Sequence, residues 1–539
     1  MVSERELEGI RREARRRVEE AGLDPWPVDF AVVGHDQLTE LAAYEGFPER
    51  YPHWRFGMNY DHYRKLAGYS DWWTYELVLN TNPALAFLRK SNSRAANKGI
   101  MIHVYAHVDF FQHNKWYKWR DNMAKVLRNH GQRIEEYMNR YGVSQVESFI
   151  DKVLSIQYNI DQHALFMKRR GQKEEGEGEE EELVKIPVKR RYMERFINPP
   201  QWIAEQKEEL KRRRERRKLL QEAELEEPQK DLLRFLMSYG QLEEWQADIL
   251  AMIREESYYF APQLMTKIMN EGWGAYWQSR IMAQGGFAGP AEIIDHADLQ
   301  SRVLGGKALN PYSLGKMIWE DIKERWDKGR FGPEWEECTD REERRRWDTK
   351  ASLGDEKIFE VRRNYNDVTF LDEFFTEELF EELDLFTYEY IPETGFYHIT
   401  SRDFAEVKKK LLFQHTNLGR PLVLVETGNY GNKGELLLVH KFTGAALHLD
   451  DARRALKNVY ELWGRPVNLK TIVKRRAREP ELKRSRPYPS RPLTAPLEEK
   501  GLMLRYDGVR WQELELPPDE VEDIRLKEDY NTVPQEWIG

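Results

Sequence analysis

The sequence has 539 residues, with 84 Lys and Arg against 93 Asp and Glu, which gives a formal net charge of −9 at pH 7. This balance argues against a nucleic-acid-binding protein, because such proteins carry an excess of basic residues. The single cysteine, Cys338, excludes an internal disulfide and a thiolate zinc site, and it fits a reducing cytoplasm. No apolar run is long enough to span a membrane, and the N-terminus lacks signal-peptide character. We therefore expect a cytoplasmic protein of about two to four domains.

The N-terminal part begins with an amphipathic helix over residues 3–22, and residues 35–46 again have a helical pattern. Residues 46–57 contain too much Gly and Pro for a helix and are rich in aromatic and basic side chains. His53 and Arg55 in this loop are candidates to bind an anionic or carboxylate group of a substrate. A packed surface loop with a Trp anchor is an equally good interpretation.

Residues 60–90 and 115–139 carry aromatic side chains at helical spacing, which predicts the core of a helix bundle. Between them, residues 99–114 also permit a helix, and this helix has His103 and His107 one turn apart. The two imidazoles lie roughly 40° apart around the helix and about 6 Å apart along it, so both can reach one metal ion. A pair of hydrogen-bonded core histidines would show the same spacing.

A second pair with the same spacing, Asp109 and His113, lies on the neighbouring stripe of this helix. These side chains could orient the first pair, contact a substrate or hold a second metal. Further along, an acidic segment at about 170–185 predicts a mobile loop. The basic run 211–218 is more typical of a solvated helix face than of a nucleic-acid site.

Residues 228–283 return to a dense helical pattern and contain the sequence Asn-Glu-Gly-Trp-Gly at residues 270–274. Glu271 is the candidate third metal ligand, because two His on one helix and a Glu on another form a known zinc-ligand set. Glu255 and Glu256 precede two Tyr and a Phe, so one of these carboxylates is a candidate general base with a perturbed pKa. A surface ion pair is the alternative. His296 is a candidate proton shuttle or substrate contact.

The pattern of residue types changes near residue 388, where short apolar runs alternate with Gly- and Asn-rich turns. We expect a small α+β domain over residues 388–475, suited to docking rather than to chemistry. Residues 476–539 contain basic and Pro-rich stretches, and we expect an extended tail that wraps the protein or binds a partner. Residues 1–387 would then form the mainly helical core that carries the metal site.

The stretches around His103 and Glu271 resemble those of the SpoVR family (stage V sporulation protein R). The likeness runs from about residue 5 to about residue 470, and further matching stretches are Arg50–Met58, Arg254–Phe260, Leu309–Gly315 and Asp321–Gly332. The resemblance implies a role in bacterial spore formation, particularly of the spore cortex. It also implies a PrkA-like protein kinase and its operon partner as candidate partners, because family genes often lie beside the kinase gene.

A looser resemblance is to gluzincin peptidases, whose ligands are the two His of H-E-x-x-H and a Glu on a later helix. It implies His103, His107 and Glu271 as zinc ligands in a zincin-like helical domain. The chain departs from that pattern because Val104 stands where the catalytic Glu follows the first His. Asp109, Glu255 and Glu256 are candidates to replace that base. Gln278 stands where many SpoVR members seem to carry His, which leaves a fourth protein ligand in doubt.

The sequence thus predicts a mainly α protein with a small C-terminal α+β domain. The first functional hypothesis is a zinc-dependent hydrolase, acting on peptide or amide bonds. The second is a non-catalytic regulatory or scaffold protein of sporulation that acts with the PrkA-like kinase system. An iron site or a di-metal site that includes Asp109 and His113 is a third possibility, and the oligomeric state is left open.

Overall fold

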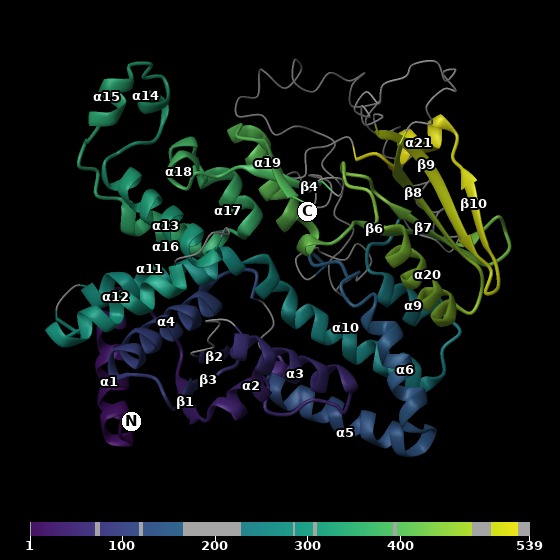
Figure 1. The fold of residues 1–539 in the computed structure, drawn as a ribbon, viewed down its shortest axis with the longest axis horizontal. Helices are drawn as coiled ribbons and strands as arrows, with labels where there is room; N and C mark the ends of the chain where they lie inside the picture. Colours follow the sequence, from purple (N-terminus) through teal and green to yellow (C-terminus); the bar gives the residue numbers. More distant parts are fainter. Residues whose placement is uncertain are drawn as a thin grey trace, which may run out of the picture. The chain divides into compact units, whose positions relative to one another are not determined.

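The computed structural model describes residues 2–69, 76–117, 122–164, 228–283, 286–304, 310–391, 396–476 and 497–526. The described residues form two compact units. The first unit contains those up to 158 and from 243 to 420, and the second those from 159 to 242 and from 421 onwards. The mainly α architecture with an α+β C-terminal region is confirmed (Figure 1). The acidic segment near 170–185 and the basic run 211–218 lie outside the described residues.

The first unit contains a small sheet that the sequence pattern did not reveal. Strands β1 (Val28–Val33), β3 (Ala84–Arg89) and β2 (Glu76–Leu79) lie side by side in that order, with β1 parallel and β2 antiparallel to β3. Two of these strands fall in residues 60–90, where we expected helices. Short apolar runs such as Ala84–Arg89 suit either a strand or a buried helix, and here strand pairing decides between them.

Helix α4 (Arg94–His113) is the central element of the first unit. Ser93 caps its N-terminus by accepting a hydrogen bond from the backbone of Ala96. Nearly every residue from Ala95 to Phe111 is buried, because the helix packs against β2, β3, α1 (Glu4–Glu20), α11 (Lys267–Ala283), α12 (Pro290–Leu304) and α16 (Gly354–Asn364). A helix that is buried all round can hold polar side chains away from water, which is the setting that a metal site needs.

Helix α11 is fixed by close backbone contact with α13 (Pro311–Asp327). A Cβ atom placed on Gly272 would lie 2.4 Å from the backbone of Gly315, so both positions require glycine. At the start of α11, the carboxylate of Asp367 accepts hydrogen bonds from the backbone N–H groups of Ile268 and Met269, at 2.8 and 2.9 Å. Asp367 itself begins helix α17 (Asp367–Phe374). The first turn of α11 therefore has a fixed position.

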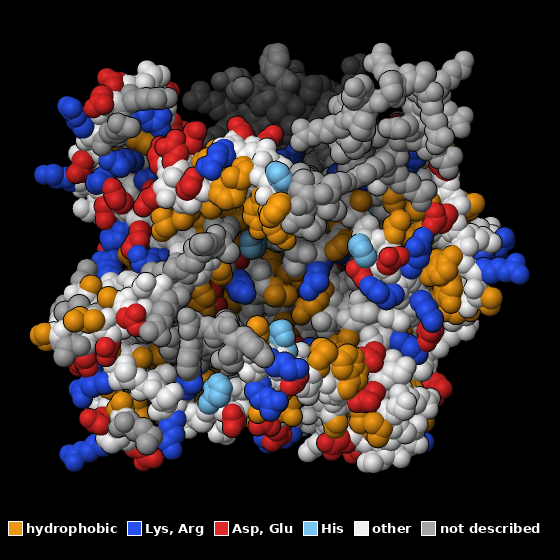
Figure 2. Space-filling view, viewed as in Figure 1, with side chains coloured by type: hydrophobic (Ala, Val, Ile, Leu, Met, Phe, Trp, Pro, Cys, Tyr) orange, Lys and Arg blue, Asp and Glu red, His pale blue; other side chains and the backbone are white. Residues whose placement is uncertain are grey.

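The remaining described elements of the first unit surround this centre. They are α2 (His35–Ala43), α3 (Trp54–Tyr69), α5 (Met123–Tyr141), α6 (Val143–Leu154), α10 (Glu244–Met265), α14 (Pro333–Glu336), α15 (Arg341–Arg346), α18 (Glu377–Glu382), α19 (Phe404–His415) and the hairpin β4 (Thr387–Ile391) and β5 (Phe396–Ser401). Figure 2 shows basic side chains interspersed with acidic ones over α1, where Arg16 pairs with Glu13. Among the described helices, none is long and apolar enough to cross a membrane.

The second unit contains a five-stranded sheet in the order β10-β9-β8-β7-β6. Its strands are β6 (Val423–Tyr430), β7 (Glu435–His440), β8 (Val467–Arg476), β9 (Leu497–Tyr506) and β10 (Trp511–Glu515), with helices α9 (Leu232–Tyr239), α20 (Leu449–Trp463) and α21 (Pro518–Ile524). The structure differs here from the expected extended tail, because β9 and β10 complete the sheet. Residues 497–506 form strand β9 because they pair with the distant strand β8, and the local sequence pattern did not indicate this pairing.

Candidate metal site

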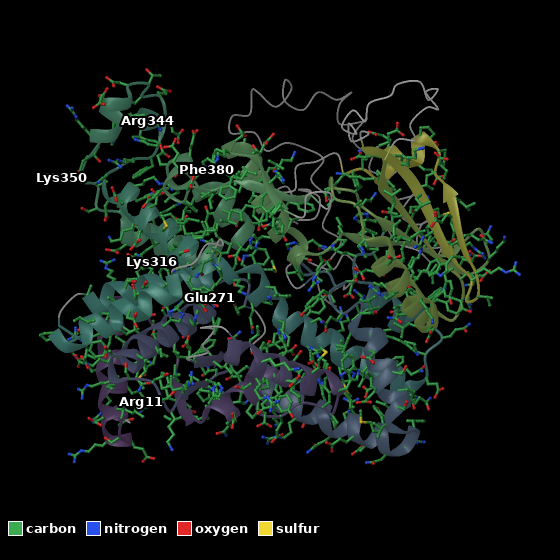
Figure 3. The ribbon with its side chains drawn as sticks, viewed as in Figure 1. Arg11, Glu271, Lys316, Arg344, Lys350 and Phe380 are labelled. Carbon is green, nitrogen blue, oxygen red and sulfur yellow. The ribbon has the colours of Figure 1, made fainter. Side chains whose placement is uncertain are left out.

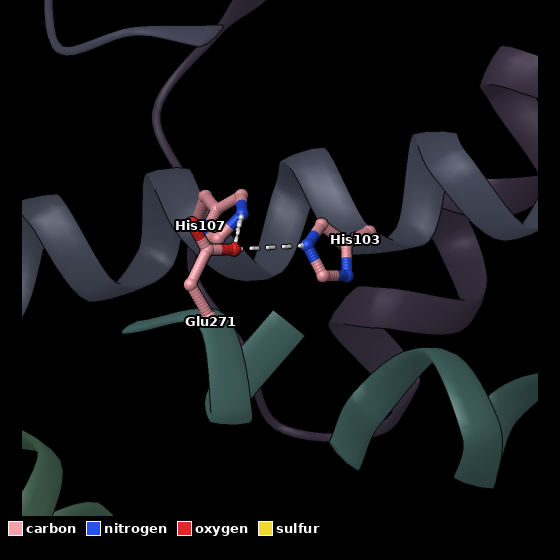
Figure 4. A group of neighbouring side chains, drawn as sticks. All are labelled: His103, His107 and Glu271. Atoms are coloured by element: carbon pink, nitrogen blue, oxygen red, sulfur yellow. Dashed lines mark ion pairs between the residues drawn. The ribbon is translucent and has the colours of Figure 1, made fainter. Parts of the chain in front are cut away.

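Three side chains from two helices converge in the first unit, and we call them the α4–α11 cluster. His103 and His107 project from α4, and Glu271 projects from α11 (Figure 4). Each offers a ligand atom, and these atoms all lie within 4.8 Å of one another. Oε2 of Glu271 lies 3.7 Å from Nε2 of His103 and 3.5 Å from Nε2 of His107. The structure therefore brings together the three residues that the sequence predicted as metal ligands.

The atoms of this cluster lack the partners that buried polar atoms normally have. Both ring nitrogens of His103 and Oε2 of Glu271 are buried without a hydrogen-bond partner among the described residues. Leaving such an atom unsatisfied costs about 1–3 kcal/mol. Ligand atoms on a tetrahedral zinc ion, with bonds of about 2.0–2.1 Å, lie about 3.3 Å from one another. The observed separations of 3.5 and 3.7 Å are close to this value, so the residues fit a zinc ion.

The orientation of His107 also suits a metal ligand. Its Nδ1–H donates to Oδ1 of Asn270 at 2.9 Å, which leaves the lone pair on Nε2 directed at the cluster. His103 packs tightly against α11, because a Cβ atom on Gly274 would lie 2.5 to 2.8 Å from its ring atoms. Asn270 and Gly274, which lie on either side of Glu271 in α11, thus set the positions of both imidazoles.

The charges in the cluster are strongly coupled. Burial by itself would raise the pKa of Glu271, but its interaction with His103 and His107 outweighs burial and holds that pKa well below its usual range. Burial opposes protonation of His107, yet its interactions with Glu271 and Asn270 raise its pKa. The same interactions favour a proton on His107 beside the Glu271 carboxylate. A metal cation would displace that proton.

Two further side chains reach this cluster, and sequence reasoning missed both of them. Tyr312 of α13 stacks on His103 with ring centroids 6.0 Å apart. The charge of Glu271, together with burial, raises the pKa of Tyr312 well above its usual range, so its phenol keeps its proton. Glu76 of β2 interacts electrostatically with both histidines and with Glu271, and burial raises its pKa. Figure 3 shows Glu271 where α11 passes α4.

A signal for Tyr312 was present, because it lies in one of the stretches that resemble the SpoVR family. No such signal existed for Glu76. It lies in a short strand that the sequence pattern gave as helix, so the direction of its side chain was not predictable.

Asp109 and His113 lie on the same helix as the cluster but have other partners. One oxygen of Asp109 accepts the backbone N–H of Asp24 at 2.9 Å, and the other accepts from Trp273 at 3.1 Å and Arg362 at 2.6 Å. The Asp109 carboxylate is fully buried and links α4 to α11 and α16. Nε2 of His113 lies 3.7 Å from Asp109 and 3.3 Å from the carbonyl oxygen of Asp24. Asp109 and Arg362 thus form a buried structural ion pair, and His113 lies beside it.

Glu255 and Glu256 belong to a different group, which we call the α5–α10 cluster together with Arg50 and His130. Nε2 of His130 lies 3.1 Å from Oε2 of Glu255, and its Nδ1 lies 3.4 Å from Oε1 of Glu256. The buried guanidinium of Arg50 donates to Glu256 at 2.8 Å. Burial would raise the pKa of Glu256, but Arg50 and His130 lower it. The structure thus gives both carboxylates partners of their own within this cluster.

The other candidate residues are dispersed in the first unit. His53 is buried, with Nε2 3.4 Å from Asp151, and Arg55 donates to Glu45. His53 and Arg55 therefore already face acidic groups, and the loop expected over residues 46–57 is wrong at its end, because α3 begins at Trp54 and includes Arg55. Gln278 lies about two turns beyond Glu271 on α11, against Gly99 of α4, which is one turn before His103. His296 falls in α12, but its side chain lies outside the described part of the structure.

Comparison with known proteins identifies relatives of the whole first unit. A family model described as "SpoVR like protein" matches residues 2–420. An uncharacterised protein of Escherichia coli (strain K12), YcgB, is 26% identical over 475 residues, which are 83% of this chain and 88% of that protein. No solved structure matches the chain. The matched family region ends at the residue where the first unit ends.

Proposed function

The chain belongs to the SpoVR family, and on this premise we propose that it is a metal-dependent hydrolase of amide or peptide bonds that acts in spore formation. His103, His107 and Glu271 hold one zinc ion. The observation that carries this proposal is the convergence of three ligand atoms within 4.8 Å, together with the lack of a hydrogen-bond partner, among the described residues, for both ring nitrogens of His103 and for Oε2 of Glu271. Two neutral imidazoles and one carboxylate form a ligand set found in catalytic zinc sites.

When bound, zinc supplies Lewis-acid polarisation of a substrate carbonyl and lowers the pKa of a water molecule. The chain's own residues do the rest. Asn270 orients His107 through its hydrogen bond. Tyr312 stacks on His103 and keeps its phenol proton, and in this proposal it donates a hydrogen bond to the oxygen on which negative charge develops.

The sheet beside the cluster supports an extended peptide as the substrate class. In the described residues, β2 is the edge strand of the order β1-β3-β2 and pairs with β3 alone. A free strand edge can pair with an extended peptide through backbone hydrogen bonds. Because β2 also contacts α4, a peptide bound along this edge would pass close to the histidines.

A second candidate function is a non-catalytic regulatory or scaffold protein of sporulation, with a PrkA-like kinase as its partner. The observation that favours it is Val104, which occupies the usual position of the catalytic Glu and is fully buried in the core. In that case the metal would stabilise the fold without taking part in chemistry.

Elemental analysis of the purified protein tests the proposal. We expect about one equivalent of zinc in the wild type and its loss in His103→Ala and Glu271→Gln, because each variant removes one of the three ligands. His130→Gln is the matched control, since it alters a buried histidine of the α5–α10 cluster and should keep the zinc. A metal-free wild type would contradict the proposal and favour the scaffold. Iron, or two equivalents of metal, would bring Asp109 and His113 back as ligands.

A further inference from the structure

The direction of the Glu76 side chain follows from strand register. Glu76 pairs with Leu88, and Val78 pairs with Ala86, across the antiparallel strands β2 and β3. Directly paired residues project to the same face of a sheet. The face with Ala86 and Leu88 packs in one core cluster with the residues of α4, whereas Leu77, Leu79, Leu85 and Phe87 belong to a separate core cluster. Glu76 therefore projects toward the helix that carries both histidines.

Glu76 lies on the face of the sheet that packs against α4, and its carboxylate interacts with the α4–α11 cluster without being one of its ligands. It interacts electrostatically with His103, His107 and Glu271, and its charge also acts on Tyr312. The group of ligand atoms that lie within 4.8 Å of one another comprises the first three residues and not Glu76. A carboxylate that faces the ligand helix without being a ligand is suited to exchange a proton with a bound water or substrate.

The site also lacks such a group at its usual place. A Glu directly after the first histidine would have to replace Val104, whose side chain packs in the apolar core with no exposed surface. The other carboxylates proposed from the sequence are committed elsewhere, since Asp109 binds Arg362 and Glu256 binds Arg50. Glu76 is the carboxylate that the described structure adds to this region.

We propose that Glu76 is the proton-accepting carboxylate of the site, supplied from the edge strand β2 instead of from the histidine helix. The inference rests on the proposed hydrolase function. In the reaction, the carboxylate of Glu76 takes a proton from water as the water oxygen bonds to the substrate carbonyl carbon. Glu76 then gives that proton to the leaving nitrogen as the C–N bond breaks. No oxidant or further reactant is needed.

Acetohydroxamic acid is a suitable probe, because it chelates zinc and gives up its O–H proton to a neighbouring carboxylate. We would measure zinc content by elemental analysis and acetohydroxamate affinity by calorimetry for the wild type, Glu76→Gln and Glu76→Asp. Glu76→Gln should keep about one equivalent of zinc and bind the probe about tenfold or more weakly, because a charge-assisted hydrogen bond is lost. Glu76→Asp should recover part of that affinity. Glu255→Gln is the matched control and should bind as the wild type does.

Two outcomes would overturn the role of Glu76 while leaving the metal site intact. Loss of zinc in a folded Glu76→Gln protein would make Glu76 a ligand, and unchanged probe affinity would show that it exchanges no proton. Circular dichroism of each variant establishes that it is folded, and if Glu76→Gln fails to fold, the zinc content and probe affinity of Glu76→Asp decide. A wild type without zinc would refute the proposed function itself, and this inference with it.

Discussion

The first unit contains two buried clusters built from the same side chains, and they differ in how their charge is balanced. In the α5–α10 cluster, Glu256 has the guanidinium of Arg50 at 2.8 Å and His130 at 3.4 Å. In the α4–α11 cluster, Glu271 has two imidazoles at 3.5 and 3.7 Å, and neither imidazole is permanently charged. A buried carboxylate needs a compensating cation. The α5–α10 cluster has that cation in Arg50, whereas the α4–α11 cluster depends on a proton on His107 or on a bound metal ion.

This difference explains why similar residues lead to different roles. An arginine keeps its charge at every physiological pH, so the α5–α10 cluster is a permanent ion pair that holds helices together. Histidine releases its proton near neutral pH and then offers a lone pair to a metal. A pair of buried His and Glu residues therefore indicates a metal site only where no arginine or lysine already neutralises the carboxylate.

The largest effect should come from removing the cation of the α5–α10 cluster. Arg50→Met leaves Glu256 buried without its charge partner, which we expect to lower the free energy of unfolding by about 3–5 kcal/mol. Urea unfolding followed by circular dichroism measures this loss. The control is Arg55→Met, because Arg55 is more exposed and pairs with the half-buried Glu45. We expect that variant to lose about 1 kcal/mol or less. Equal losses in the two variants would contradict the special role of Arg50.

The next effect concerns how zinc and pH act on the α4–α11 cluster. In zinc-free protein, the raised pKa of His107 contributes stability that is present below about pH 6.5 and is lost as pH rises through the raised value. The lowered pKa of Glu271 contributes stability that is present above about pH 4.5 and is lost as pH falls toward the lowered value. The His107–Glu271 pair should therefore stabilise the zinc-free protein most between about pH 4.5 and about pH 6.5. Zinc binds the deprotonated histidine, so its benefit should instead grow as pH rises.

Urea unfolding with zinc or with chelator at about pH 5, 6.5 and 8 measures this difference. At zinc concentrations of about 100 times Kd, the gain should reach about 2.7 kcal/mol at the highest pH. His103→Ala should show no gain from zinc. The lowered pKa of Glu256 makes the α5–α10 cluster lose stability as pH falls below about 4.5, with or without zinc. A zinc effect that is the same at every pH would refute competition with the His107 proton.

The smallest effect should come from a single methyl group beside His103. Gly274→Ala puts a Cβ atom within 2.8 Å of that ring, so the imidazole must move and zinc should bind about tenfold more weakly. Gly57→Ala is the matched control, because Gly57 also lies in a helix and has nothing within 4 Å of its Cβ position. That control should keep its zinc affinity and gain up to about 1 kcal/mol in stability. Calorimetric zinc titration compares the two, and equal affinities would contradict the contact.

The helix that carries the histidines and its relation to Glu271 were predictable from the sequence. The i and i+4 spacing of His103 and His107 places them on one face of any helix, whatever surrounds it. The Asn-Glu-Gly-Trp stretch indicated Glu271 as the third member. The structure brings the three ligand atoms together, while the binding of a metal there stays a prediction.

The features of the fold and of the site that could not be predicted from the sequence depend on contacts between distant segments. The strand that carries Glu76 has four residues, too few for its periodicity to distinguish a strand from a helix. Its pairing with β3 and its packing on α4 are tertiary facts, so nothing in the local sequence indicated where Glu76 would lie. The same holds for β9 and β10, which were expected as a tail and form strands because β9 pairs with β8 and β10 pairs with β9.

The order of the ligands along the chain has a consequence for biosynthesis. His103 and His107 leave the ribosome long before Glu271, with the whole of residues 114–266 translated in between. At bacterial rates of synthesis this interval is on the order of ten seconds. During that time α4, which is buried on every side in the folded protein, lacks the helix that covers its histidines. The nascent chain thus exposes apolar surface and only two of the three clustered side chains, so a metal held by all three could bind only after the C-terminal half of the first unit has docked.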